Sequence, residues 1–247
     1  MTVSTDGRVL WWDMRHLSEP SDELFLQNKG SDERLGAISL EYNPAVGPTR
    51  FMVGTEEGCI LSCNRAKGQG DRTSAIFDGQ QGGICGVERS PFHPKYFVTC
   101  GDWTTRMWNE DLRTPISGTP SQQARLASIC WSTTRPGVYF TARADGLVDS
   151  WDILLKGHRA PSLTYQVASD QLNVIRSHAN GRLLATGGAN GKTCILGVGD
   201  ALAEALPQEK GLLVQTLEGE TLQEKNLEKA QKEAKVQEDF REALGLT

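Results

Sequence analysis

One short pattern of residues recurs five times along this chain, at intervals of about 43 to 51 residues. In each copy an acidic or amide residue begins a tight turn, and a large apolar residue follows six positions later. Self-similarity at this period predicts one supersecondary unit of four short strands per copy. The copies are STDGRVLWWD (4–13), TEEGCILSCN (55–64), CGDWTTRMWN (100–109), RADGLVDSWD (143–152) and GANGKTCILG (188–197).

The turn residues explain why each copy bends at the same place. A carboxylate or amide oxygen can accept a backbone N–H bond within the bend, and in four copies a glycine follows that can adopt positive φ. The large residue six positions on is expected to pack its face against a neighbouring unit. The turns are at Asp6, Glu57, Asp102, Asp145 and Asn190, the glycines are Gly7, Gly58, Gly146 and Gly191, and the large residues are Trp12, Cys63, Trp108, Trp151 and Leu196.

A second frame lies in phase with the first. Before each of the later four turns, an apolar strand ends in a loop containing Pro, Asn or Thr, and a new strand begins. This arrangement predicts a meander of antiparallel strands. Together the two frames predict an all-β fold, a WD40-type β-propeller with about five blades. The first blade is expected to be incomplete, because Met1 precedes the first turn by only five residues.

The repeat residues are interpreted as structural. Among the copies, Ser4, Asp6 and Trp12 keep the Ser-x-Asp and Trp arrangement that WD repeats use for a hydrogen-bonded network, whereas Gly157-His158 is interpreted as a loop. The residues assigned to the repeat scaffold are Ser4, Asp6, Trp12, Asp13, Glu57, Asp102, Trp108, Asp145, Trp151, Asp152 and Asn190.

Composition excludes several classes of function. The 247 residues carry a formal net charge of −5, with no basic cluster, so nothing attracts the chain to nucleic acid or to anionic membranes. No leader pattern or run of 18 apolar residues is present, which predicts a soluble intracellular protein.

The six cysteines lie singly in strand-like segments and are predicted to be buried, reduced thiols. Cys59 and Cys63 are the nearest to a metal-ligand pair, but no second pair follows.

Enzyme chemistry finds no support in the motifs. Residues 187–191 (GGANG) could be a phosphate loop, but they coincide with a blade turn, and no helix pattern or Lys-Ser/Thr follows. His16, His93, His158 and His178 are scattered over different copies without a nucleophile setting. We therefore predict no catalytic residue, no cofactor and no metal. An enzyme built on the propeller is the third hypothesis, after the two protein-binding functions described next.

The sequence resembles the WD-repeat half of axonemal dynein intermediate chains, most closely the outer-arm type. The stretches that carry the resemblance are STDGRVLWWDMRHLSEP (4–20), LGAISLEYN (35–43), FMVGTEEGCILSCNR (51–65) and GDWTTRMWNED (101–111). The resemblance implies a non-catalytic scaffold subunit of a ciliary motor, located in the cytoplasm, the cytoskeleton and the axoneme of the cilium or flagellum. It implies a dynein heavy chain and a second dynein intermediate chain as partners, with dynein light chains as further ones and indirect association with microtubules. A general WD40 adaptor in an unrelated complex is the alternative, which fold alone cannot separate.

The resemblance implies a propeller of seven or more blades, whereas this chain shows five turns. We therefore expect this chain to be the C-terminal part of a longer protein or a shortened gene product. The consecutive apolar residues 9–12 (VLWW) fit a strand covered on both faces. Since adjacent side chains point to opposite faces, either Trp11 or Trp12 is expected to be exposed when no blade precedes them.

The C-terminal segment is predicted to be a helix over 218–244, so the chain divides into a propeller portion, 1–217, and a helical tail, 218–247. The tail lacks Pro, is rich in Glu, Lys, Ala and Gln, and places Glu228 four residues before Lys232. Its apolar positions follow no strict heptad. Either it is a solvated, partly frayed helix or it binds a partner.

Trp103 occupies the turn position where other copies have glycine, so it is expected at the rim of one propeller face. Exposed aromatic residues of this kind anchor binding partners. The alternative is that its ring folds onto an adjacent loop, near Arg106. Trp103 and Arg106 are therefore the candidate partner-binding residues.

Overall fold

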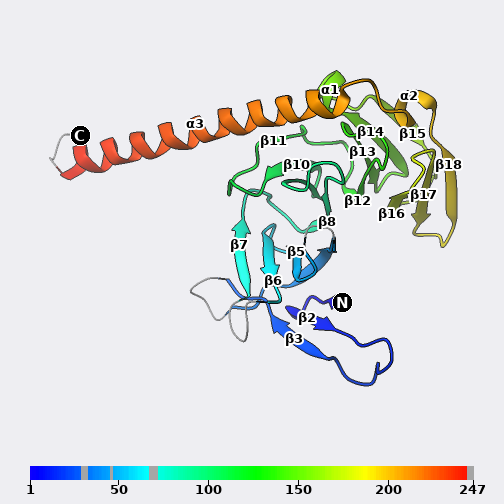
Figure 1. The fold of residues 1–247 in the computed structure, drawn as a ribbon, viewed down its shortest axis with the longest axis horizontal. Coiled ribbons are helices and arrows are strands. Elements are labelled where there is room, and N and C mark those ends of the chain that lie inside the picture. The colour runs from blue at the N-terminus through cyan, green and yellow to red at the C-terminus, as the bar shows by residue number, and fades with distance from the viewer. Residues whose placement is uncertain (29–32, 45–46, 67–71, 244–247) are drawn as a thin grey trace.

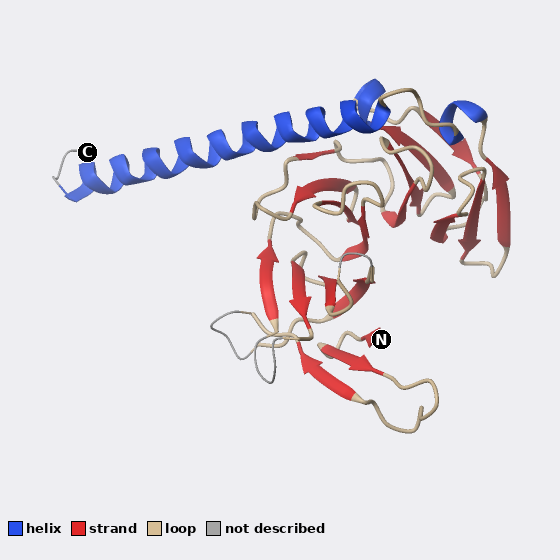
Figure 2. Ribbon diagram, in the orientation of Figure 1, coloured by secondary structure: helices blue, strands red, loops and turns tan. Residues whose placement is uncertain are grey.

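The structure is a computed structural model that describes residues 1–28, 33–44, 47–66 and 72–243, with no side-chain description at 237–243. The described chain contains five antiparallel sheets that follow one another along an arc, and a long helix that projects from it (Figures 1 and 2). We call the sheets blades one to five. The predicted all-β propeller fold with a C-terminal helix is confirmed.

The strands of each blade are consecutive in the chain. Blade one contains β1 (Thr2–Val3), β2 (Arg8–Trp11) and β3 (Asp22–Phe25); blade two contains β4 (Ala37–Glu41), β5 (Arg50–Thr55), β6 (Ile60–Asn64) and β7 (Thr73–Phe77). Blade three contains β8 (Ile84–Arg89), β9 (Tyr96–Gly101), β10 (Thr104–Asn109) and β11 (Ser117–Gly118). Blade four contains β12 (Leu126–Trp131), β13 (Val138–Arg143), β14 (Leu147–Asp152) and β15 (Leu163–Gln166), and blade five contains β16 (Leu172–Ser177), β17 (Leu183–Gly188) and β18 (Thr193–Gly197).

Each predicted turn joins the second and third strand positions of a blade. Gly7, Gly58, Gly146 and Gly191 have φ of +77°, +91°, +82° and +76°, as expected. In blade three the positive φ falls instead on Asp102, at +55°, because Trp103 stands where the other copies have glycine. The first blade lacks the innermost strand, as predicted, and β1 takes the second position beside β2. Blade five also has three strands, because the chain after β18 turns into a short helix, α2 (Asp200–Ala203).

The inner strands line the concave side of the arc. β4 lies against β8, β8 against β12 and β12 against β16, so in blades two to five the first strand of each blade contacts the first strand of the next. In blade one, β1, which takes the second position, contacts β4. Arg176 of β16 reaches past β12 to Glu88 of β8, with 3.1 Å between the guanidinium and the carboxylate. This ion pair joins blade three to blade five.

The hydrophobic core is divided into layers between successive blades. Trp108 packs with Phe77 of blade two and stacks on Phe97, with ring centroids 6.0 Å apart. Trp151 packs against blade three and stacks on Tyr139 in the same way. The expectation that the repeat tryptophans face the neighbouring blade therefore holds for both. In blade one Trp11 is buried against blade two, and Trp12, on the opposite face, is half-buried.

Two further helices lie within blade four and after blade five. α1 (Ile153–Lys156) comes directly after β14, and α3 (Glu209–Ala243) is the long projecting helix. α3 begins at Glu209 and not at Glu218, so the proposed division at 217/218 falls inside one continuous helix. Its first turns pack on blades three and four, which corrects the expectation of a helix wholly outside the propeller. None of the described helices is long and apolar enough to cross a membrane.

Candidate partner-binding surfaces

The repeat network consists of bonds between indole and threonine side chains. Trp108 Nε1 donates to Thr99 Oγ1 at 2.9 Å, and Trp151 Nε1 donates to Thr141 Oγ1 at 3.1 Å. Trp12 Nε1 donates to Thr2 Oγ1 at 2.9 Å. The hydroxyl that pairs with each tryptophan therefore lies on the preceding strand. The hydrogen-bonded network expected from Ser4, Asp6 and Trp12 in the first copy therefore joins Trp12 to Thr2, and the corresponding bonds in blades three and four were not predicted.

The turn residues hold the bends in more than one way. Asp6 Oδ1 accepts from Arg8 N at 3.1 Å, and Asn190 Oδ1 accepts from Lys192 N at 2.9 Å, as predicted. The Asp145 carboxylate instead binds the guanidinium of Arg143. Asp13 is the last residue of the first copy and pairs with exposed Arg15, while Glu57 is exposed at the turn of blade two. These residues stabilise turns and make no common site.

Trp103 lies at the tip of the turn between β9 and β10, with 48% of its surface exposed. Its backbone carbonyl accepts from Gln122 N at 2.8 Å, so the backbone of the tip is fixed while the ring remains accessible. Arg106 is half-buried on β10, beside Gly118 of β11. The structure thus presents the aromatic ring predicted at the rim. Whether it anchors a partner stays a prediction.

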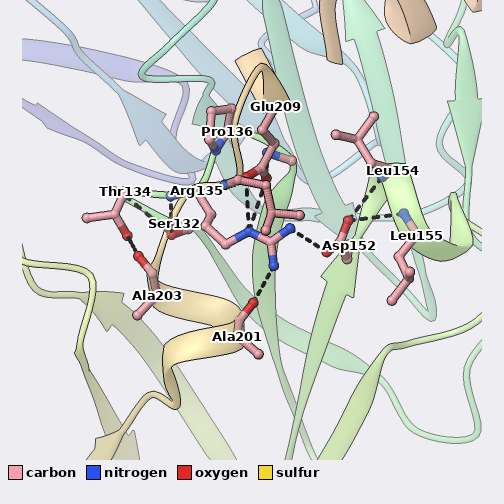
Figure 3. A network of polar contacts seen from close by, with 12 residues as sticks. Ser132, Thr134, Arg135, Pro136, Asp152, Leu154, Leu155, Ala201, Ala203 and Glu209 are labelled. Atoms are coloured by element: carbon pink, nitrogen blue, oxygen red, sulfur yellow. Dashed lines mark hydrogen bonds and ion pairs between the residues drawn. The ribbon is translucent and has the colours of Figure 1, made fainter. Parts of the chain in front are cut away.

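A buried polar network fixes the start of α3. Arg135 Nε donates to Glu209 Oε1 at 3.1 Å, and Arg135 Nη2 donates to Asp152 Oδ2 at 2.8 Å (Figure 3). Arg135 Nη1 also donates to the carbonyl oxygen of Ala201, in α2. Arg135, Asp152 and Glu209 are each at most 4% exposed. Charges removed from water to this degree are tolerated only when paired, so the network ties blade four to the beginning of α3.

Both carboxylates of this network have further partners. Asp152 caps α1 by accepting from Leu154 N and Leu155 N, each at 3.1 Å. Glu209 Oε2 accepts from Leu206 N at 2.8 Å, and as the first residue of α3 it lies at the positive end of the helix dipole. The scaffold role assigned to Asp152 from its place after Trp151 therefore includes holding Arg135. Sequence analysis missed Arg135 and Glu209, which lie 74 residues apart.

Beyond Glu209 one stripe of α3 faces the propeller. Leu213 and Leu217 are fully buried with Tyr96 and Ile153, and Asn109 Nδ2 donates to Thr221 Oγ1 at 3.2 Å. The last contact is Thr114 Oγ1 to Glu228 Oε1 at 2.8 Å. Residues 229–236 are all exposed, and Figure 1 shows the helix leaving the blades. At 1.5 Å per residue, roughly 20 Å of helix extends past this contact.

The histidines lie in separate places. Burial lowers the pKa of His158 to about 4, so its imidazole is neutral near pH 7. Burial also lowers the pKa of His93, with the nearby charge of Lys210 adding to the effect.

All six cysteines are free thiols; Cys63, Cys100 and Cys130 are buried, and the other three are half-buried. Among the described residues, no cluster of three or more His, Cys, Asp and Glu could hold a metal ion. Residues 187–191 form the end of β17 and a blade turn.

Successive antiparallel blades, each with a turn between its second and third strand positions and with indole–threonine hydrogen bonds in three of them, define a WD40-type β-propeller domain. A family model described as the dynein axonemal intermediate chain 3 WD40 domain matches residues 46–198. The chain therefore belongs to the WD40 family of axonemal dynein intermediate chains, which confirms the resemblance seen in the sequence.

Relatives in three organisms agree with this assignment. The chain is 46% identical over 239 residues to the 70 kDa intermediate chain of flagellar outer-arm dynein from Chlamydomonas reinhardtii, covering 96% of this chain and 42% of that protein. It is 44% identical over 249 residues to ciliary dynein intermediate chain 3 of Heliocidaris crassispina, covering 99% and 41%. It is 40% identical over 242 residues to human dynein axonemal intermediate chain 2, covering 96% and 40%. The chain thus spans about two fifths of these relatives, whose flagellar and ciliary origin confirms the axonemal, cytoskeletal location.

Proposed function

We propose that this chain is part of a non-catalytic scaffold subunit of an axonemal outer-arm dynein. The subunit binds a dynein heavy chain and a second intermediate chain, and so supports assembly of the arm and ciliary movement. Its association with microtubules is indirect, through the complex. The observation that carries the proposal is the 46% identity to a flagellar outer-arm intermediate chain across nearly the whole chain.

The exposed part of α3 is the first surface that we assign to a partner. Isolated helices are marginal in water, and most helical stability comes from tertiary packing. Residues 229–236 are all exposed, and the ion pair of Lys232 with Glu228, at 4.0 Å, is weak. A helix held at its start by a buried network, with an exposed segment further along, is suited to reach a neighbouring subunit.

The exposed ring of Trp103 is the second surface. It stands on a short turn between two paired strands, so its loss would remove binding area without altering the core. Trp103→Ala in the full-length protein is expected to reduce capture of one partner while the melting temperature stays the same. Equal losses of binding and of thermal stability would count against the anchor.

The proposal is tested by affinity capture of the tagged full-length protein from ciliated cells. We expect a dynein heavy chain and a second intermediate chain to co-purify. A deletion of residues 229–247 leaves the docked half of α3 intact, and should lower the yield of at least one of them. A preparation without any dynein subunit would contradict the proposed function. An unchanged yield from the deletion would contradict only the role of the exposed part of α3.

The alternative, a general WD40 adaptor, predicts a different set of captured proteins. Such an adaptor would bring down components of one unrelated complex in stoichiometric amount, with dynein subunits absent. The regions that match the relatives cover at least 96% of the chain, so they include α3 as well as the blades. For this reason we prefer the dynein scaffold.

A further inference from the structure

The loop between β10 and β11 makes the last hydrogen bond between the blades and α3. Thr114 lies in this loop, and its hydroxyl group donates to Glu228 Oε1 at 2.8 Å. Among the described residues, this is the only hydrogen bond from α3 to the blades beyond Thr221. Glu228 is half-buried, whereas residues 229–236 are all exposed. The bond therefore marks the point where α3 leaves the propeller.

The side of α3 that faces the blades becomes acidic toward this point. It is apolar at Leu213 and Leu217, which are fully buried. At helical spacing beyond Leu217 come Glu224 and Glu228, and both are half-buried. Carboxylates on a docked surface need hydrogen-bond donors. The Thr114 hydroxyl supplies one, so the contact depends on the proton of that hydroxyl group.

Thr114 also occupies a position in the sequence that a class of modifying enzyme recognises. Three residues of the chain are Ser or Thr followed by Pro: Ser90, Thr114 and Thr119. Ser90 and Thr119 are 0% and 7% exposed, whereas Thr114 is half-buried and the preceding Arg113 is exposed. Among the described residues, the backbone N–H groups of Arg113 and Thr114 make no hydrogen bond. This part of the loop can therefore become extended in an enzyme cleft without the loss of a strand pairing.

The Thr114 hydroxyl can become accessible without unfolding of the blades. Helices without tertiary packing are marginal in water, and residues 222–228 are held to the blades by one hydrogen bond. The start of α3 is held separately, by the buried pairing of Glu209 with Arg135. Local opening of residues 222–228 therefore frees the hydroxyl group while the base of the helix stays docked.

We propose that Thr114 is a phosphorylation site for a proline-directed protein kinase, and that its modification releases α3 from the blades beyond Thr221. The phosphoryl donor is a nucleoside triphosphate. The Thr114 oxygen forms a bond to the γ-phosphorus, the bond from this phosphorus to the β–γ bridging oxygen breaks, and the nucleoside diphosphate leaves. The hydroxyl proton passes to the catalytic base of the kinase.

The phosphate changes the contact from attraction to repulsion. Phosphothreonine has no hydroxyl proton to donate to Glu228, and it carries a charge of about −1.5 to −2 beside the acidic side of α3. The neighbouring guanidinium of Arg113 lies over the ring of Phe77, 5.1 Å from the ring centroid, and is engaged there. Modification therefore traps the open state of residues 222–228, whichever complex the protein joins.

The first test is phosphorylation of the purified full-length protein by a mitogen-activated protein kinase with Mg²⁺ and ATP, with sites mapped by mass spectrometry. A synthetic peptide of residues 108–122 contains both Thr-Pro sites without the fold. We expect phosphate on Thr114 and Thr119 in the peptide. In the folded protein we expect it on Thr114, but not on Ser90 or Thr119. An unmodified Thr114 in the folded protein would overturn the proposal, whether or not the peptide is modified.

The second test is amide hydrogen exchange of the phosphorylated protein. Residues 222–228 should exchange about fivefold faster or more, the factor expected for the loss of one stabilising contact, while residues 210–217 keep their protection. Thr114→Glu should act in the same direction. Ser121→Glu adds the same charge at an exposed position after β11 and should leave the exchange unchanged.

Reversing the charge on α3 separates repulsion from a general disturbance of the loop. Glu228→Lys places a cation opposite Thr114, so phosphorylation of this variant should slow the exchange of residues 222–228. The proposal is overturned if phosphorylation leaves the exchange of the parent protein unchanged, if Ser121→Glu has the same effect, or if Glu228→Lys responds as the parent does. Slower exchange in the phosphorylated parent would also overturn it, and would indicate that lysines such as Lys232 bind the phosphate.

Discussion

At the scale of single residues, the hydrogen bonds of the repeat tryptophans differ in burial. Thr141 and Trp151 are both inaccessible to solvent, so the indole N–H has one acceptor and no access to water. Thr2 is exposed and Trp12 is half-buried, although the bond between them has nearly the same length. The same indole–threonine hydrogen bond is therefore expected to contribute differently to the free energy of unfolding in blade four and in blade one.

We expect Thr141→Val to lower the free energy of unfolding by about 1 to 3 kcal/mol, because the buried indole N–H loses its acceptor. Thr2→Val, the matched change at an exposed copy, should cost less than about 0.5 kcal/mol, because water replaces the hydroxyl. Urea denaturation of both variants measures the difference. Equal destabilisation would show that the bond has no special role in the blade core.

His158 should make stability depend on pH. Its pKa is about 4 in the folded chain against 6.5 ordinarily, so between these values the unfolded chain binds more protons. Stability is thus highest above pH 6.5 and falls as the pH drops toward 4, by up to about 3 kcal/mol. Glu88, whose pKa burial raises to about 7, acts in the opposite direction over part of this range. Comparing His158→Gln with the parent chain isolates the histidine; parallel curves would contradict the predicted shift.

At the scale of elements, α3 depends on contacts distant in the sequence. Its buried stripe, Leu213, Leu217 and Thr221, follows helical spacing, but the helix is fixed at its start by the pairing of Glu209 with Arg135. The projecting half has no equivalent support among the described contacts. The element therefore combines a docked base with an exposed segment, residues 229–236.

Glu209→Gln should destabilise the chain by about 3 to 5 kcal/mol, because it leaves the buried Arg135 guanidinium with less compensating charge. Amide hydrogen exchange should show the loss first in residues 210–221 of α3. Arg182→Gln, at an exposed ion pair with Asp200 and Glu204, is the matched control and should cost at most about 1 kcal/mol. If the control were as damaging as Glu209→Gln, the network would not be what holds the helix.

The sequence predicted the elements whose causes are local. The blade turns need a glycine or an Asx side chain, and these recur at readable positions such as Gly146 and Asn190. The start of α3 could not be read in this way, since the residue that holds Glu209 lies in the blade-four loop. The Thr2 partner of Trp12 could not be predicted for a related reason: the hydrogen bond joins neighbouring strands, and its hydroxyl lies outside the Ser-x-Asp pattern of the turn.

At the scale of the whole molecule, the two terminal blades have a free face among the described residues. Blade four covers one face of blade five through Ile175 and Leu184. The opposite face carries Val174, Leu183 and Ile195, which are 42%, 39% and 62% exposed. In the interior blades the corresponding faces are covered by the next sheet. This open apolar face is a site for association.

We therefore expect the 247-residue chain by itself to be oligomeric or poorly soluble. Ile195→Lys should shift the distribution toward monomer without loss of β structure, because it places a charge in the centre of the open face. Light scattering after size-exclusion chromatography measures both. A monodisperse, cooperatively melting monomer of the parent chain would contradict this reading of the terminal blades.

We propose that the protein carrying this chain is a structural component of outer-arm dynein. The most direct measurement is sedimentation of a high-salt extract of axonemes, with the full-length protein and the dynein heavy chains quantified in each fraction. We predict that the protein sediments with a heavy chain at a constant ratio across the dynein peak, and that it is depleted from axonemes lacking outer arms. Sedimentation as a light species apart from every heavy chain, with normal amounts in armless axonemes, would contradict the account.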